Sequence, residues 1–221
     1  YPLVALAVPQ PPPNAPVGGM AGLAGGMEKL HDYIPPRGGA YFLVAGLRFR
    51  SFGLINTFAL LAVKFGQELE IDLLGVSSVI LPAGFFELNF LVRFLPTEGY
   101  FMARGELTAR SYIYVPQVHL SGGFAAGFWF HPSPYSGDFV VTVGGYHPLY
   151  AVPGHYPNDV SRLAINWQVS NEMSIKAGVY FAITPKVVMA GGFMDASYNS
   201  GLLSAWLKIN ANFIIWWEPY H

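Results

Sequence analysis

The sequence predicts an all-β protein, a long-stranded antiparallel meander with a Pro/Gly-rich N-terminal extension. Apolar and polar residues alternate along many runs, several of them about ten to fifteen residues long, and this alternation is the period of strands with one buried face. Turn residues separate successive runs by short connections, which implies antiparallel pairing. Because ordinary strands average about 5 to 6 residues, runs this long indicate a wide, curled sheet that closes as a barrel, folds as a sandwich or stays open.

The alternation places about ten or eleven strands in the chain. It is strongest at residues 85–94, 101–115, 163–169, 173–183 and 203–217, and weaker at residues 41–50, 57–65, 68–76, 118–130, 139–143 and 187–198. Glycines inside several of these runs, Gly122 among them, predict bulges or bends.

One face of these strands is predicted to be apolar throughout. Its representative residues are Phe86, Leu88, Phe90, Ile175, Val179, Phe181, Ile209, Phe213 and Trp217. The composition agrees, since 52% of the residues are hydrophobic and only 11% are charged. Water cannot cover so much apolar surface without a large free-energy cost, so we expect another layer, a neighbouring subunit or lipid to cover it.

Residues 1–39 form a separate block from the β domain of residues 40–221. Residues 1–8 predict an edge strand with Tyr1, Leu3, Val4, Leu6 and Val8 as its assembly residues. The segment PQPPPNAP that follows is typical of a polyproline II spacer. The next residues are glycine-rich and favour a flexible connector, with a short helix at residues 20–31 as the alternative. This block resembles a strand on a tether, which a neighbouring molecule could accept at an open sheet edge.

The composition excludes several classes of partner and site. With a net charge of −1, the chain lacks the positive charge that attracts nucleic acid. The absence of cysteine excludes disulfides, thiolate metal sites and a cysteine nucleophile. No apolar run reaches the roughly 20 residues of a transmembrane helix. We expect no cofactor, and an extracellular or cell-surface location is favoured.

Two histidines in the loop after residues 139–143 are the weak candidates for a metal or catalytic centre. His147 and His155 lie close in sequence to Asp138 and Asp159, and imidazole with carboxylate could bind a metal. His147 is followed directly by a proline, and His155 lies one residue from a proline. The favoured interpretation is therefore a fixed loop in which the imidazoles hydrogen-bond to backbone carbonyls.

Three carboxylates at alternate positions, Glu68, Glu70 and Asp72, share one face if their segment is a strand. Such a group could bind calcium or provide a catalytic acid and base. A solvated polar face opposite Arg48 and Arg50 is the favoured interpretation.

Ordered motifs over residues 40–221 resemble the bacterial and fungal domain of unknown function 6603 family. They include AYFLVAGLRFRSF, HLSGGFAAGFWF, GDFVVTVGGYHP, RLAINWQVS, MSIKAGVYFAITP and WWEPYH. The resemblance implies a β-rich architecture and membership of that family. It brings no established activity, ligand or catalytic residue to this chain.

These observations favour a non-enzymatic structural protein that self-associates or joins a larger β-rich assembly, with neighbouring subunits covering its apolar face. N-terminal strand donation is one route to that assembly. Three alternatives stay open: a trough that binds lipid or another hydrophobic ligand, an outer-membrane-type barrel, and an enzyme centred on the loop of His147 and His155.

Overall fold

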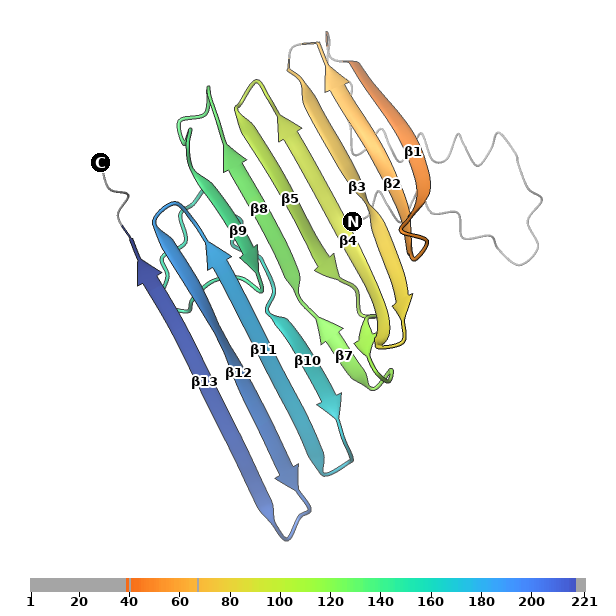
Figure 1. Ribbon diagram of the computed structural model, residues 1–221, viewed down its shortest axis with the longest axis vertical. Coiled ribbons are helices and arrows are strands. Elements are labelled where there is room, and N and C mark those ends of the chain that lie inside the picture. The colour runs from red at the N-terminus through yellow and green to blue at the C-terminus, as the bar shows by residue number, and fades with distance from the viewer. Residues whose placement is uncertain (1–38, 40, 67, 218–221) are drawn as a thin grey trace, which may run out of the picture.

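The chain folds into one large antiparallel β-sheet. The computed structural model describes residues 39, 41–66 and 68–217, and all regular secondary structure in this part of the chain is β-strand (Figure 1). The strands are β1 (Tyr41–Ser51), β2 (Ile55–Phe65), β3 (Glu70–Leu81), β4 (Gly84–Leu95), β5 (Tyr100–Leu107), β6 (Tyr112–Ile113), β7 (Val118–Ser121), β8 (Gly123–Trp129), β9 (Phe139–Val143), β10 (Leu163–Gln168), β11 (Met173–Ile183), β12 (Val187–Asn199) and β13 (Ser204–Trp216). This confirms the predicted all-β, long-stranded antiparallel fold. Across the described residues, no helix has the length and apolarity needed to cross a membrane.

The strands follow a meander with one local detour. Nine successive antiparallel pairings lead from β1 through β2, β3, β4, β5, β8, β9, β11 and β12 to β13. The short strands β6, β7 and β10 continue the sheet beside β4 and β11. Among the described strands β1 pairs only with β2 and β13 only with β12. The sheet is therefore open, with β1 and β13 at its two edges.

The strand register assigns every strand residue to one of two faces. One row of directly paired residues crosses the whole sheet: Leu47, Ala59, Gly75, Phe90, Gly105, Phe124, Val143, Phe181, Ala190 and Phe213. We call the face that carries this row the apolar face. The opposite face carries Tyr180 and Met189, and residues 144–162 pack against part of it. We call it the loop face.

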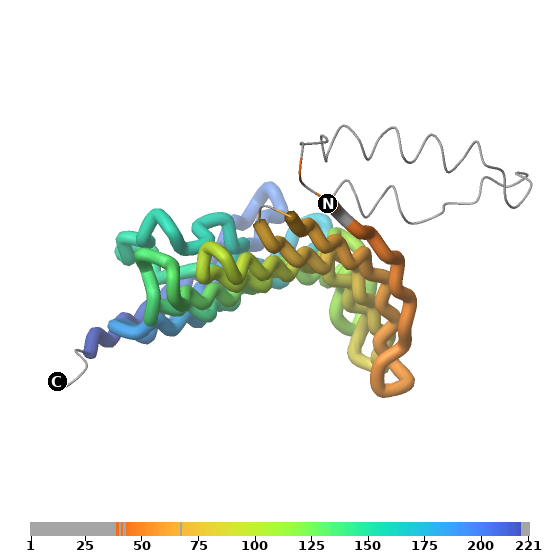
Figure 2. Tube along the Cα trace, turned by 90° about the horizontal axis from the view of Figure 1, so that it is seen from above, coloured from red at the N-terminus to blue at the C-terminus, as the bar shows by residue number. Residues whose placement is uncertain are grey.

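The best-packed part of the protein lies between the loop and the sheet. Tyr146 and Tyr156 of the loop pack with Val140, Tyr180 and Met189 of the sheet. Their burial stabilises the fold by about 1.5 to 3 kcal/mol for each large side chain before entropy is subtracted. The loop thus supplies a second layer over β8, β9, β11 and β12, and Figure 2 shows it on one side of a sheet whose profile is bent.

A pair of glycines starts this second layer. Gly144 has a φ of +72°, a left-handed conformation that glycine adopts without strain. A Cβ at this position would lie 2.3 Å from the carbonyl oxygen of Val179. Glycine therefore allows the chain to leave β9 in close contact with β11 and to turn over the sheet.

Two long strands predicted from the sequence are each divided in the structure. The predicted strand at residues 101–115 is wrong because Ser111 donates its backbone N–H to the Thr108 carbonyl at 3.0 Å, closing a turn between β5 and β6. The predicted strand at residues 118–130 breaks at Gly122, whose φ of +131° separates β7 from β8. These two breaks bring the predicted ten or eleven strands to the thirteen observed.

The predicted N-terminal strand, polyproline spacer and short helix lie outside the described residues.

Candidate functional site

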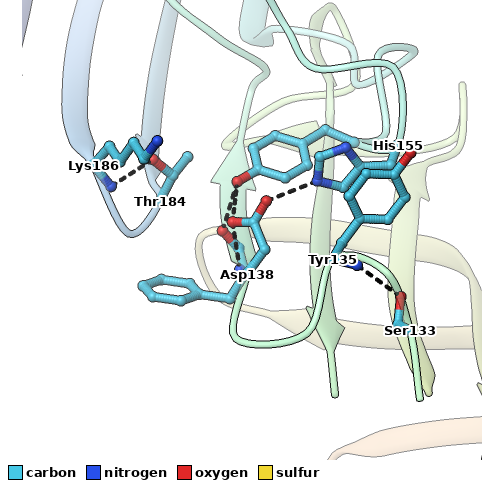
Figure 3. A network of polar contacts seen from close by, with 8 residues as sticks. Ser133, Tyr135, Asp138, His155, Thr184 and Lys186 are labelled. Carbon is cyan, nitrogen blue, oxygen red and sulfur yellow. Dashed lines mark hydrogen bonds and ion pairs between the residues drawn. The ribbon is translucent and has the colours of Figure 1, made fainter. Parts of the chain in front are cut away.

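A cluster of polar and aromatic side chains lies where the loop meets the turn between β8 and β9. The His155 Nε2 and the Asp138 carboxylate are 2.7 Å apart, and the Tyr156 hydroxyl donates to the same carboxylate. Asp138 also accepts the backbone N–H of Phe139 at 2.9 Å. Figure 3 shows His155 between Asp138 and Tyr135, with its ring stacked on the Tyr135 ring at a centroid distance of 3.9 Å. The carboxylate thereby holds the loop against the end of the sheet.

The same cluster fixes the protonation of Tyr156. Its side chain is buried, and its hydroxyl donates to the Asp138 carboxylate. Burial, followed by the hydrogen bond and the negative charge of Asp138, raises the pKa of Tyr156 well above its usual range. Tyr156 therefore stays neutral and acts as a hydrogen-bond donor in the folded protein.

An open cavity of about 460 Å³, which we call the aromatic pocket, adjoins His155. Its lining comes from the β4–β5 turn, the start of β5, the end of β8, the following turn and the loop: Thr97, Glu98, Tyr100, Trp129, Pro132, Ser133, Pro134, Tyr135 and His155. Rings and prolines dominate this lining. The pocket can therefore offer stacking surfaces to a ligand that is apolar or that binds to aromatic side chains.

The two predicted histidines have separate environments. His147 is buried, accepts the backbone N–H of Leu149 through Nδ1 at 3.0 Å, and lies edge-on to Tyr180. His155 contacts Asp138, Tyr135, Trp129 and Tyr156 instead. The expectation that both imidazoles bond to backbone carbonyls is wrong, because one accepts an amide proton and the other pairs with a carboxylate.

Asp159 pairs with Arg104 of β5 and not with either histidine. The hydrogen bond from Arg104 lowers the pKa of Asp159. Within the residues that the structure describes, no three His, Cys, Asp or Glu side chains gather closely enough to hold a metal ion. The structure thus brings Asp138 and His155 together, and leaves His147 and Asp159 with other partners.

The three predicted carboxylates lie at the start of β3 and just before it. Lys64 lies 3.7 Å from Glu68 and 3.6 Å from Glu70. Arg93 binds Asp72 through two hydrogen bonds of 2.9 Å, and the pKa of Arg93 is raised chiefly by this partner. The prediction that these carboxylates lie opposite Arg48 and Arg50 is wrong. Both arginines pair in register with Phe58 and Asn56, toward the other end of the strands.

The apolar face extends across the sheet from β1 to β13. The predicted residues Phe86, Leu88, Phe90, Ile175, Val179, Phe181, Ile209 and Phe213 all lie on it by register, while Trp217 follows the end of β13. Several stay open to solvent, with Phe213 66% and Val179 53% exposed. The predicted assembly residues Tyr1, Leu3, Val4, Leu6 and Val8 lie outside the described residues.

All charged residues of the described strands lie on the loop face. They are Arg48, Arg50, Lys64, Glu70, Asp72, Glu87, Arg93, Arg104, Glu106, Lys176, Asp195 and Lys208. The apolar face carries none of them. Among the described residues of the apolar face, Thr57 and Ser77 form the only hydrogen bond between two hydroxyl groups, at 2.8 Å.

Sequence reasoning missed Arg162, which fastens the loop. Its guanidinium donates to the carbonyls of Gly144 at 2.8 Å and Tyr146 at 2.6 Å, and lies 3.9 Å from the ring centroid of Tyr180. Burial lowers the pKa of Arg162. One sequence signal was available, since Arg162 is the basic residue directly before a predicted strand. Its partners are backbone atoms, which alternation does not reveal.

The fold and surface define a class of β-protein in which one open sheet has a charged face, partly covered by its own loop, and an uncharged face. The chain belongs to the family whose description reads "Family of unknown function (DUF6603)", because that family's model matches residues 1–221. A comparison with curated proteins finds no match. A comparison with solved structures finds none either.

Proposed function

We propose that this protein is a non-enzymatic structural protein that assembles with further copies of itself through the apolar face of its sheet. The observation that carries the proposal is the segregation of charge. All charged residues of the described strands lie on one face, and exposed Leu, Ile, Val and Phe side chains occupy the other. A large contiguous apolar patch on a protein surface marks an interaction site.

The shape of the apolar face favours a second sheet as its cover. Its side chains come from strands in regular register, so the face forms a continuous pleated surface. Two such surfaces pack about 10 Å apart when their side chains interdigitate, as in a β-sandwich. A second copy of this chain supplies a surface of matching extent and chemistry.

The open edges support assembly in a second direction. Because nine antiparallel pairings separate β1 from β13, the two edge strands run in opposite directions. A copy displaced sideways therefore presents β1 antiparallel to its neighbour's β13, with both apolar faces on the same side. The β13 edge could equally accept the strand predicted at residues 1–8, and either pairing satisfies unpaired backbone groups.

Sedimentation velocity without detergent tests the proposal with two neighbouring residues of β13. Leu207 points to the apolar face and is 51% exposed, whereas Trp206 points to the loop face and is 76% exposed. We expect the unaltered protein to form large species, Leu207→Glu to weaken association at least tenfold, and Trp206→Glu to leave it nearly unchanged.

Equal effects of the two substitutions would contradict assembly through the apolar face. Wild-type protein that sediments as a monomer with bound acyl lipid would also contradict it, and would make the sheet a carrier of hydrophobic ligands.

A further inference from the structure

The aromatic pocket combines stacking surfaces with hydrogen-bond donors that the fold does not use. Tyr100 and Trp129 pack at a centroid distance of 5.6 Å, and Tyr135 closes the pocket from the next turn. Among the described residues, the hydroxyls of Tyr100 and Tyr135 and the indole N–H of Trp129 have no acceptor, and none of these atoms is buried without a partner. They are therefore available to a ligand.

The charge of the pocket limits the ligand further. Glu98 supplies a carboxylate at the rim, and no Lys or Arg contributes to the lining. The nearby guanidinium groups of Arg93 and Arg104, which act on Tyr100, are already paired with Asp72 and Asp159. An anionic ligand would therefore meet the Glu98 charge without an unpaired cation to balance it. The pocket instead suits an uncharged ligand that presents apolar surface together with hydrogen-bond acceptors.

A proline-rich segment in the polyproline II conformation has this combination. Its rings are apolar, its carbonyls have no internal hydrogen bonds, and proline has no N–H to satisfy. Grooves lined by aromatic side chains recognise such segments in other proteins, and the ligand loses little entropy because its conformation is already extended. The chain itself contains a sequence typical of this conformation, PQPPPNAP at residues 9–16.

We propose that the aromatic pocket binds residues 9–16 of the same chain. Residues 17–38 connect this segment to the start of the described sheet, and at about 3.3 Å per residue they reach about 70 Å. Four strand spacings of about 4.8 Å and one strand length separate β1 from the pocket by less than about 50 Å. A tether of this length gives an effective concentration in the millimolar range, which favours the segment of the same chain over that of a neighbour.

Binding at this site would fix the point from which residues 1–8 extend. The inference does not depend on assembly, because it concerns a contact within one chain. A monomeric protein could make this contact as well as an assembled one.

Disulfide trapping in the full chain tests the contact directly, since the chain has no cysteine of its own. Asn14→Cys is combined with Thr97→Cys at the exposed pocket rim, or with Leu202→Cys in the exposed turn between β12 and β13 as a control. Under mild oxidation we expect the pocket pair to form a disulfide within one chain at least tenfold faster than the control pair. Pro11→Ala, Pro12→Ala and Pro13→Ala introduced together should remove that difference.

Three results would overturn the proposal. Equal trapping rates for the two pairs would show that the segment does not favour the pocket. An unchanged rate after the triple proline substitution would show that its prolines are not recognised. Cross-linked dimers in place of a disulfide within one chain would assign the pocket to the segment of a neighbouring molecule.

Discussion

The two faces of this sheet differ in how far their apolar side chains are buried. On the loop face, residues 144–162 fold back and bury Met189 to 1% exposure. On the apolar face, Phe213 of the adjacent strand remains 66% exposed. Both residues belong to paired, regular strands, so local structure alone does not decide burial. Met189 is buried because residues 144–162 lie over it, whereas Phe213 stays exposed on the face that these residues leave uncovered.

The largest expected difference between the faces is in core substitutions. Met189→Ala removes packing under the loop and should lower the free energy of unfolding by about 2 to 5 kcal/mol at any protein concentration. Leu207→Ala on the apolar face should cost less than about 1 kcal/mol in dilute protein, and its cost should grow with concentration because association stabilises the wild type. Urea unfolding at two protein concentrations measures both. If the cost of Leu207→Ala does not depend on protein concentration, association does not bury the apolar face, and the proposed difference between the two faces is wrong.

A second test asks whether Arg162 holds the covering layer. Arg162→Gln removes hydrogen bonds to two loop carbonyls and the contact with Tyr180, and we expect a loss of about 2 to 3 kcal/mol because hydrogen bonds to charged groups are strong. Arg110→Gln is the matched control. Arg110 pairs with Glu87 but is 72% exposed, so its loss should be below about 1 kcal/mol. Similar losses in the two variants would show that Arg162 is not a fastener.

A smaller effect is expected at alkaline pH. The pKa of Tyr156 is raised in the folded protein by burial and by Asp138, whereas in the unfolded chain it is about 10. Below about pH 10 tyrosine is neutral in both states, and the stabilisation is complete. Above that pH the unfolded chain loses its proton first, so the folded state binds more protons and stability falls as the pH rises.

Tyr156→Phe should reduce this alkaline loss, to which Tyr146 with its raised pKa also contributes, while Tyr114→Phe, at an exposed position, should have a smaller effect. Unfolding curves recorded between neutral pH and about pH 11 provide the measurement. A wild-type stability that rises over this range would have the opposite sign to the one expected from the buried hydroxyl.

Strand positions could be predicted because alternation records which face each residue occupies. Phe86, Leu88 and Phe90 were assigned to one face from sequence, and the register with β3 and β5 places them together. The turn at residues 108–111 could not be predicted in this way. Its polar residues also fit an alternating strand, and the side chain of Ser111 is held by backbone atoms of Glu87, which is distant in sequence.

The candidate site was only partly visible in the sequence for a similar reason. The sequence identified Asp138 and His155 as weak candidates for a metal or catalytic centre, but their pairing depends on how the loop folds over the end of β8. Trp129 belonged to the predicted strand at residues 118–130 and Tyr135 lay between two predicted strands, and nothing in their spacing indicated a shared pocket. Contacts between a long loop and a sheet follow from tertiary packing, which periodicity does not encode.

Electron microscopy of the purified protein without detergent, with mass spectrometry of lipid extracted from the same sample, tests the central claim most directly. We expect ordered assemblies that contain no stoichiometric lipid, because copies of the chain cover one another's apolar faces. Dispersed single particles that carry acyl lipid would contradict it, since lipid would then be the cover.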